Sequence, residues 1–260
     1  MAIIAKSVDG GLAIGADEVE VVVTRDQGLE VSVRRGSIEN LELSNDFSFS
    51  VSLLFGKRKG SVSSTNFDQS SIKTLLAKAK DLSLLLQMDP HYGLPPSELS
   101  PKKMIEMDLD HPWIAEPGDA VEMALTIESA GLSLDERLLK SDSAGVSTTK
   151  SLVGYGNSNG FSAVVPSTRH SISSIFVAGQ KDGMQRDHWY SVDRDPNELS
   201  EADEVGREAA RRSLAKLNPK RPYSGVFPVL FAPNCASSLI SHFVSAVSGS
   251  SQFKKASFLL

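Results

Sequence analysis

A helix-like stretch near the end of the chain carries a single histidine in a place where metal chemistry is plausible. Between Asn234 and Gly249, apolar residues recur at helical spacing and serines gather on the other side, with His242 on the border between them. A metallopeptidase carries its zinc ligands on a buried helix of this kind. This helix has no second histidine and no glutamate. It is therefore either an active site or the remnant of one.

A second group of reactive side chains lies within residues 184–191. On a β-strand, side chains alternate between two faces, so both faces of this run would mix polar, charged and aromatic residues. Such mixing is unfavourable unless the polar groups are paired or meet a partner. We therefore expect either an ordinary strand with internal salt bridges or a recognition strand. In the second case the residues in contact with a peptide or partner are Arg186, His188, Trp189 and Tyr190.

Residues 156–160 match the G-x-S-x-G pattern of a nucleophile elbow, with Ser158 as the nucleophile. That elbow needs a helix directly after the serine, whereas residues 161–165 have the pattern of a strand that ends at Pro166. Asn-Gly pairs are typical of hairpin turns. We therefore expect a turn at this position and keep a serine hydrolase only as an alternative.

Several other polar residues have no spacing that suits a metal site. Asp193, Asp195 and Asn197 resemble the start of a calcium loop, but Glu198 stands where that loop needs glycine, so we expect a polar loop. The remaining candidates have no ligand-spaced neighbours and are expected to be structural: His91, His170, Asp108 and Asp110.

The composition excludes several classes of protein. The net charge of −5 argues against a nucleic-acid-binding surface. The single cysteine, Cys235, excludes an internal disulfide and a multi-cysteine zinc site, which fits the reducing cytoplasm. We also expect no signal peptide and no membrane span, because no apolar run reaches the length of a transmembrane helix.

The first part of the chain is expected to form a sheet. Alternating apolar and polar residues from Glu18 to Thr65, with turn signals at Arg35-Gly36 and at 56–60, predict an antiparallel β-meander. The stretch Asp68–Leu82 carries one apolar stripe and is predicted to be the helix that covers this sheet. Residues 88–117 contain six prolines, which indicates a connecting excursion.

A further strand-rich region with two helices is expected to follow. Its helices are predicted over Asp119–Ala130 and from Ser200 to Asn218, and its strands over 132–141, 146–155, 161–165, 172–178 and 184–192. Runs of strands interrupted by helices indicate an α+β fold. We expect an N-terminal α+β domain over residues 1–220.

Residues 221–260 are expected to begin a second, truncated domain. A buried strand is predicted over Val226–Phe231, followed by the helix with His242. The apolar run Ser257–Leu260 is predicted to be a strand whose sheet lies beyond the end of this chain. The chain is therefore expected to be a fragment or a truncated form.

Several short motifs, taken in order, resemble the PmbA (TldE) branch of the TldD/PmbA family, whose members are also called modulators of DNA gyrase. They extend over nearly the whole chain: GADEV at 15–19, GLEV at 28–31, RRGSIE at 34–39, MDL at 107–109, NSNGF at 157–161, residues 184–191, PVLF at 228–231 and SHF at 241–243. The resemblance implies the N-terminal portion of a longer protein. Family members continue into a second, C-terminal β-rich domain that this chain would lack.

The resemblance also implies a partner and a lost metal site. In this family the TldD-type subunit carries a zinc-binding His-Glu-x-x-x-His helix, and the PmbA-type subunit pairs with it to form a metallopeptidase. Laid on this chain, Ser241 and Ala246 take the two histidine positions and His242 takes the glutamate position. Hydroxyl and methyl groups cannot hold zinc, and without the metal no water is activated. We therefore predict no metal and no catalytic residue here, with zinc in the TldD-type partner.

The function that this resemblance implies is that of a non-catalytic subunit. It would help a TldD/TldE-type zinc metallopeptidase to bind and proteolyse unfolded peptides, as in microcin maturation or antitoxin degradation. It would act in the cytoplasm in a heterodimer, or as a homodimer without its partner, and would contact neither nucleic acid nor membrane. The alternative is a regulatory protein that acts on DNA gyrase or an antitoxin without proteolysis. Enzyme activity is expected only together with the partner.

Overall fold

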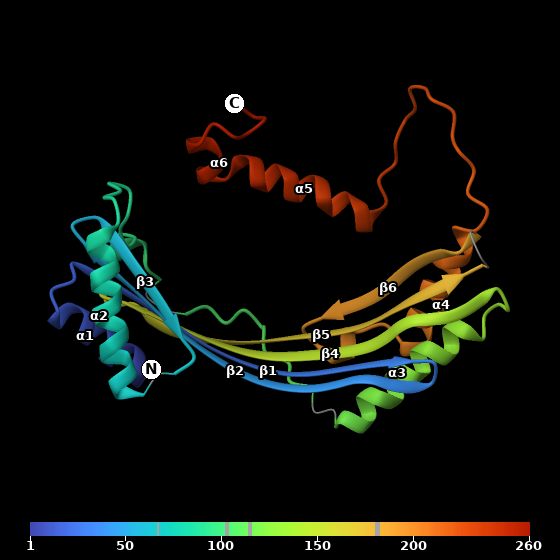
Figure 1. Cartoon of the computed structure of the whole chain (residues 1–260), viewed down its shortest axis with the longest axis horizontal. Coiled ribbons are helices and arrows are strands. Elements are labelled where there is room, and N and C mark those ends of the chain that lie inside the picture. The colour runs from blue at the N-terminus through green and yellow to red at the C-terminus, as the bar shows by residue number, and fades with distance from the viewer. Residues whose placement is uncertain (67, 102–103, 114–115, 180–182) are drawn as a thin grey trace. The chain divides into compact units, whose positions relative to one another are not determined.

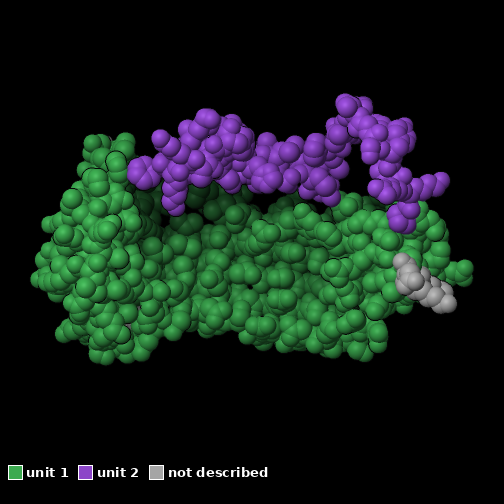
Figure 2. Space-filling model, turned by 45° about the horizontal axis from the view of Figure 1, so that its top comes forward, with its two compact units in different colours: residues 1–218 green, residues 219–260 purple. Residues whose placement is uncertain are grey.

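The computed structural model of the chain describes all residues except 67, 102–103, 114–115 and 180–182. The chain divides into two units, residues 1–218 and residues 219–260, and each is described by itself (Figure 1; Figure 2). In the described part of the chain, no helix combines the length and apolar character needed to cross a membrane.

Six strands in residues 1–218 form one antiparallel sheet in the order β3-β2-β1-β4-β5-β6. Because β1 pairs with β4, two three-stranded meanders join side by side in a single curved sheet (Figure 1). The predicted α+β class and antiparallel meander are confirmed. The strand bounds are β1 Glu18–Arg34, β2 Ser37–Phe55, β3 Arg58–Ser64, β4 Leu138–Asn157, β5 Ser162–Ala178 and β6 Gln185–Asp193.

The predicted turns are correct, but the strands are longer than predicted. Arg35 and Gly36 both have positive φ, as a tight hairpin requires, and they join β1 to β2. The prediction that Pro166 ends its strand is wrong, because β5 continues through it and Pro166 pairs with Leu152. β6 pairs with β5 only from His170 onward, so at Pro166 the strand has one neighbour and its missing N–H interrupts no second ladder.

Two helices cover one end of the sheet. They are α1, Ala2–Ala13, where no helix was predicted, and α2, Gln69–Leu85. Asp68 caps α2 by accepting a hydrogen bond from Ser71 N–H. The core at this end is built from both helices and from alternate residues of β1 and β2: Ile4, Val19, Val21, Phe49, Val51, Leu53, Leu76 and Ala79.

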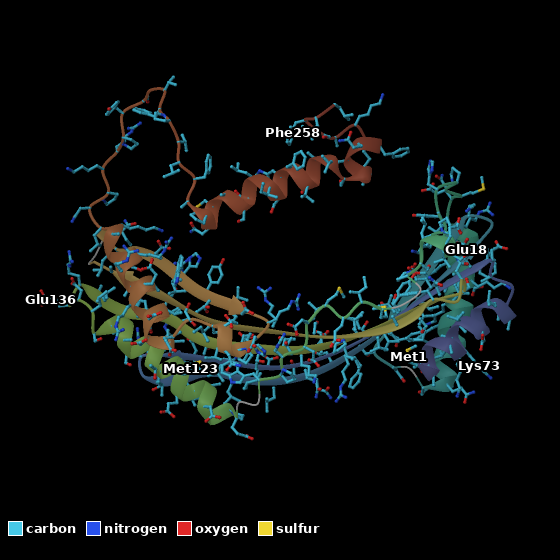
Figure 3. All side chains as sticks on the ribbon, turned by 180° about the vertical axis from the view of Figure 1, so that it is seen from behind. Met1, Glu18, Lys73, Met123, Glu136 and Phe258 are labelled. Carbon is cyan, nitrogen blue, oxygen red and sulfur yellow. The ribbon has the colours of Figure 1, made fainter. Side chains whose placement is uncertain are left out.

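Two further helices, α3 (Pro117–Leu132) and α4 (Ala202–Ala215), cover the other end. Figure 3 shows Met123 on α3 and Lys73 on α2, which mark the two helix pairs at opposite ends of the sheet. The core under α3 and α4 includes Leu29, Val31, Val33, Ile127, Val146, Ile172 and Val205. Both helix pairs thus pack on the face formed by the odd-numbered residues of β1. No described α-helix of residues 1–218 covers the opposite face, which we call the open face.

Residues 219–260 contain two helices, α5 (Pro233–Val247) and α6 (Gly249–Phe253). Neither of the predicted strands, Val226–Phe231 and Ser257–Leu260, is formed, and the described residues of this unit include no strand that could pair with them. The helix is confirmed, but its N-cap is Ala232 rather than Asn234. The expected burial of its apolar side is also wrong, since its large apolar residues are about half exposed.

Candidate functional site

β6 carries the four predicted contact residues and separates them between two faces. Arg186, His188 and Tyr190 lie on the open face and are exposed. The rings of His188 and Tyr190 are stacked, with centroids 6.3 Å apart and planes 9° from parallel. Arg186 Nη1 lies 3.0 Å from a carboxylate oxygen of Asp142 in β4. These three side chains therefore form a cationic and aromatic row along the border strand of the sheet.

Trp189 lies on the opposite face of β6 and contacts the helices. It packs against the apolar clusters beneath α3 and α4, and the guanidinium of Arg212 lies 4.9 Å from its ring centroid. The predicted alternation along this strand is confirmed. The peptide or partner contact predicted for Trp189 would need a different surface from that of Arg186, His188 and Tyr190.

Asp187, on the same face of β6 as Trp189, fixes β6 to α4. Its backbone N–H donates to Ser213 Oγ (3.1 Å), and its buried carboxylate lies 3.2 Å from Lys216 Nζ and 3.5 Å from Arg212 Nε. Burial alone would raise the pKa of Asp187. The hydrogen bond from His188 N–H and the charges of Lys216 and Arg212 outweigh it, so the pKa lies below its usual value. This carboxylate is a structural anchor.

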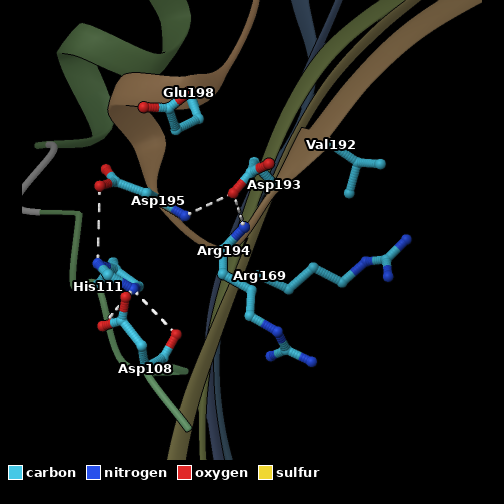
Figure 4. A pocket seen from close by; sticks show the side chains of 8 residues that line it. All are labelled: Asp108, His111, Arg169, Val192, Asp193, Arg194, Asp195 and Glu198. Atoms are coloured by element: carbon cyan, nitrogen blue, oxygen red, sulfur yellow. Dashed lines mark hydrogen bonds and ion pairs between the residues drawn. The ribbon is translucent and has the colours of Figure 1, made fainter.

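A polar pocket of about 610 Å³ lies where β6 ends, and Figure 4 shows its lining. In its lining, His111 Nε2 is 3.2 Å from Asp108 Oδ1 and His111 Nδ1 is 3.6 Å from Asp195 Oδ2. Asp108 has a positive φ of 52°, which is unusual for a residue other than glycine. The pocket is lined by Asp108, His111, Arg169, Val192, Asp193, Arg194, Asp195 and Glu198.

Local hydrogen bonds already occupy much of the polar capacity of this pocket. Asp193 Oδ1 accepts the backbone N–H groups of Arg194 and Asp195, and Asp195 Oδ1 accepts that of Asn197. Among the described residues, no group of three or more histidine, cysteine, aspartate or glutamate side chains is arranged to hold a metal ion. The predicted polar loop at 193–198 is therefore confirmed. No sequence signal pointed to the pocket, because 108–111 and 193–198 meet only in the folded chain.

His170 lies beneath this pocket and holds the connecting segment against β5. It is buried, with Nδ1 2.7 Å from Thr148 Oγ1 and Nε2 2.9 Å from the backbone oxygen of His111. The ring of Trp113 meets the His170 ring edge-on at 5.6 Å. His170 is therefore a structural core histidine, as expected from the sequence.

Ser158 lies in the turn between β4 and β5. Its Oγ accepts the backbone N–H of Val19 (3.0 Å), and its own N–H donates to the Val19 carbonyl (2.9 Å). A strand follows rather than a helix. The turn interpretation is confirmed, and a nucleophile elbow is excluded because the geometry that it requires is missing.

The three positions of the degenerate motif lie on α5 and do not fit a zinc ion. Ser241 Oγ donates to the Ser237 carbonyl (3.1 Å), His242 is exposed and Ala246 is buried. Only His242 is a zinc ligand by type. We therefore derive no metal-assisted step from this chain.

Two family models match the chain. PmbA/TldA metallopeptidase domain 1 matches residues 19–83, and the PmbA/TldA metallopeptidase central domain matches residues 110–217. Metalloprotease PmbA of Escherichia coli O157:H7 is 34% identical over 245 residues, which are 94% of this chain and 54% of the relative. The Metalloprotease PmbA homolog of Haemophilus influenzae is 33% identical, over 93% of this chain and 53% of the relative. The chain spans about half the length of these curated relatives.

Solved structures share the fold. A modulator of DNA gyrase from Bacteroides thetaiotaomicron superposes with a TM-score of 0.93 at 24% identity, over 100% of this chain and 59% of that one. TldE from Thermococcus kodakarensis superposes with a TM-score of 0.71 at 16% identity, over 82% of this chain and 47% of that one. At these identities the structures show the fold alone. The two matching family models and the curated relatives above 30% identity show that the chain belongs to the PmbA/TldD metallopeptidase family.

Proposed function

We propose that this chain is a PmbA/TldE-like, non-catalytic part of a TldD/TldE-type zinc metallopeptidase, and that it helps the complex to bind and cleave unfolded peptides. In this proposal the zinc and the activated water belong to a TldD-type partner. The complex is a heterodimer that acts in the cytoplasm, where the single cysteine of the chain, Cys235, stays reduced. Microcin maturation and antitoxin degradation are the substrate classes proposed.

The composition of α5 carries this proposal. The metallopeptidase family needs a metal-activated water, yet the motif positions on α5 hold Ser241, His242 and Ala246. Ser158, the other candidate nucleophile, is held within a hairpin turn. A family member without these groups can contribute to proteolysis through binding and assembly.

The open face of the sheet supports a role in binding. Arg186, His188 and Tyr190 form an exposed row on its border strand. An extended peptide on strands is held through main-chain hydrogen bonds, with side-chain contacts adding preference, and this suits substrates of varied sequence. Trp189, on the opposite face of β6, is proposed to hold the strand that carries this row against the helices rather than to contact peptide.

The proposal is tested by purifying the chain alone, a TldD-type subunit alone and the two together. Each sample is assayed for cleavage of an unfolded peptide, and its zinc content is measured. We expect cleavage by the mixture that exceeds cleavage by either component, and stoichiometric zinc only where the TldD-type subunit is present. Stoichiometric zinc in this chain alone, lost in His242→Ala, would overturn the proposal.

Two variants separate binding from catalysis. Tyr190→Ala on the open face should raise the KM of the mixture and leave kcat unchanged, because it removes contact area and no reacting group. Ser158→Ala should leave the kinetics of the mixture unchanged. Cleavage by this chain alone that Ser158→Ala abolishes would instead make the chain a serine hydrolase.

A further inference from the structure

The outer edge of β2 pairs with no described strand from Ser37 to Asp46. β1 pairs with β2 along its length on one side, whereas β3 pairs on the other side only from Phe49 to Phe55. No other described strand adjoins this border, and Figure 1 shows β2 continuing along it beyond β3. In an antiparallel ladder, every second residue directs its N–H and C=O away from the neighbour. This stretch therefore presents a row of unused backbone donors and acceptors.

The apolar layer of the sheet continues onto this edge. Ile38, Leu41 and Leu43 are 53%, 43% and 69% exposed. Across the ladder they face residues that are buried under α3, namely Val33, Val31 and Leu29. Proteins usually protect a border strand with charged side chains, lysine above all, or with proline. Residues 37–46 contain neither lysine nor proline, and their charged side chains, Glu39, Glu42 and Asp46, are all acidic.

Side chains bind the backbone along the opposite border of the same sheet. Ser213 Oγ accepts the N–H of Asp187, the Asp187 carboxylate accepts the N–H of His188, and Lys216 Nζ donates to the Arg186 carbonyl. Three consecutive residues of β6 thus have a backbone group bound by a side chain. Among the described residues, no side chain makes an equivalent bond to the backbone of β2 between Ser37 and Asp46.

The open face beside this edge carries acidic pairs. Asp26 lies directly opposite Asp46, and Glu30 lies directly opposite Glu42, on neighbouring strands. Like charges in directly opposed positions destabilise a sheet. None of these four carboxylates forms an ion pair with a described residue. Basic side chains on an added strand would remove this repulsion.

We propose that the outer edge of β2 pairs with an extended segment of a partner polypeptide. That segment carries lysine or arginine at the positions beside Glu42 and Asp46, and apolar residues at the alternate positions beside Leu41 and Leu43. A second copy of this chain does not fit, because pairing two β2 edges antiparallel brings Glu42 or Asp46 of one copy opposite or diagonal to a carboxylate of the other. Charge complementarity therefore selects a basic partner strand.

The test uses the 260-residue chain and two labelled peptides, one alternating lysine with valine and one alternating glutamate with valine. At low ionic strength, fluorescence anisotropy should show the basic peptide binding at least about tenfold more tightly. The double variant Glu42→Lys/Asp46→Lys should reverse this preference. Leu43→Lys should weaken the basic peptide by placing a cation beside its apolar positions.

A matched control variant tests whether net charge alone explains the preference for the basic peptide. Asp81→Lys/Glu122→Lys changes the charge by the same amount at exposed positions on α2 and α3, and it should keep the preference for the basic peptide. Equal loss of preference in both double variants would show attraction by net charge alone and overturn the proposal. Failure of both peptides to bind would also overturn it, as would a dimer in sedimentation that Leu43→Lys abolishes. No proteolysis is measured, so this proposal and the proposed function can fail separately.

Discussion

Large apolar side chains are buried in one unit of the chain and largely exposed in the other. In residues 1–218, Phe176 and Ile127 are fully buried between the sheet and its helices. In residues 219–260, Ile240 and Phe243 on α5 are 65% and 54% exposed. The helices concerned look alike in the sequence, because α3 and α5 both carry an apolar stripe.

The difference shows what an apolar stripe determines. The stripe determines which side of a helix can pack against another surface. That surface itself comes from elsewhere in the chain or from another molecule. For α3 the surface consists of alternate residues of β1, β4 and β5, which the hairpins bring together. Residues 219–260 contain no described strand and hence no sheet of their own on which α5 could pack.

The largest effect expected from this comparison is on the free energy of unfolding. Phe176→Ala should lower it by about 3–5 kcal/mol, because it leaves a cavity against Gly131 of α3. Phe243→Ala, the same change on α5, should alter it by less than about 0.5 kcal/mol. Urea denaturation of both variants measures the difference. Equal losses would show that α5 is buried as thoroughly as the sheet core.

A second prediction concerns the buried carboxylate of Glu128 in α3, which is 2% exposed. It accepts the N–H groups of Arg35 and Gly36 at 2.6 and 2.7 Å and the hydroxyl of Ser141, so it ties the β1–β2 turn to the helix. Glu128→Gln should cost about 2–4 kcal/mol of unfolding free energy, because the amide cannot accept at both oxygen positions. Glu122→Gln, on the exposed side of α3, is the matched control and should cost less than about 0.5 kcal/mol.

Local patterns predicted the turns and most elements of residues 1–218. Period-two alternation identified the strands, and the turn at Arg35-Gly36 was located because tight hairpins favour such residues. α1 was missed because its stripe is interrupted by Gly10 and Gly11, which weaken a helical pattern although Gly11 lies against Val19 in the core.

The features that could not be predicted from the sequence depend on contacts between residues far apart in the chain. The pairing of β1 with β4 places two meanders in one sheet, and nothing local indicates that choice. The pocket around His111 has the same origin. Val226–Phe231 has the composition of a strand but no partner strand, so its predicted conformation does not form. Of the predicted site, the alternation along β6 followed from periodicity, whereas the contact of Trp189 with Arg212 did not.

A third prediction uses pH to test the anchor of β6. The pKa of Asp187 is lowered in the folded chain, so the carboxylate stabilises the fold above the unfolded pKa of about 4, and this stabilisation is lost as pH falls through the lower folded value. The stability difference between the wild type and Asp187→Asn should therefore be largest near neutral pH and shrink in acid. Urea denaturation from neutral to acidic pH measures it.

The cause of this shift can be checked separately. Lys216→Met removes a cation 3.2 Å from the Asp187 carboxylate, so the pKa of Asp187 should rise in an NMR titration. An unchanged titration midpoint would mean that Lys216 contributes nothing and that the remaining hydrogen bond and Arg212 account for the whole shift.

The smallest predicted effect separates local from global opening. Ser241 and Ser245 on α5 both donate their hydroxyl groups to carbonyls one turn earlier, and alanine favours a helix over serine by about 0.5 kcal/mol. Ser245→Ala should therefore slow hydrogen exchange of α5 amides by about twofold and leave the β4 amides unchanged, because α5 opens without unfolding the sheet. Phe176→Ala gives the reverse test, since it should speed exchange in β4 and not in α5. If either variant changed both sets of amides together, the two units would unfold as one, and the exposed stripe of α5 would need a cover that residues 219–260 do not contain.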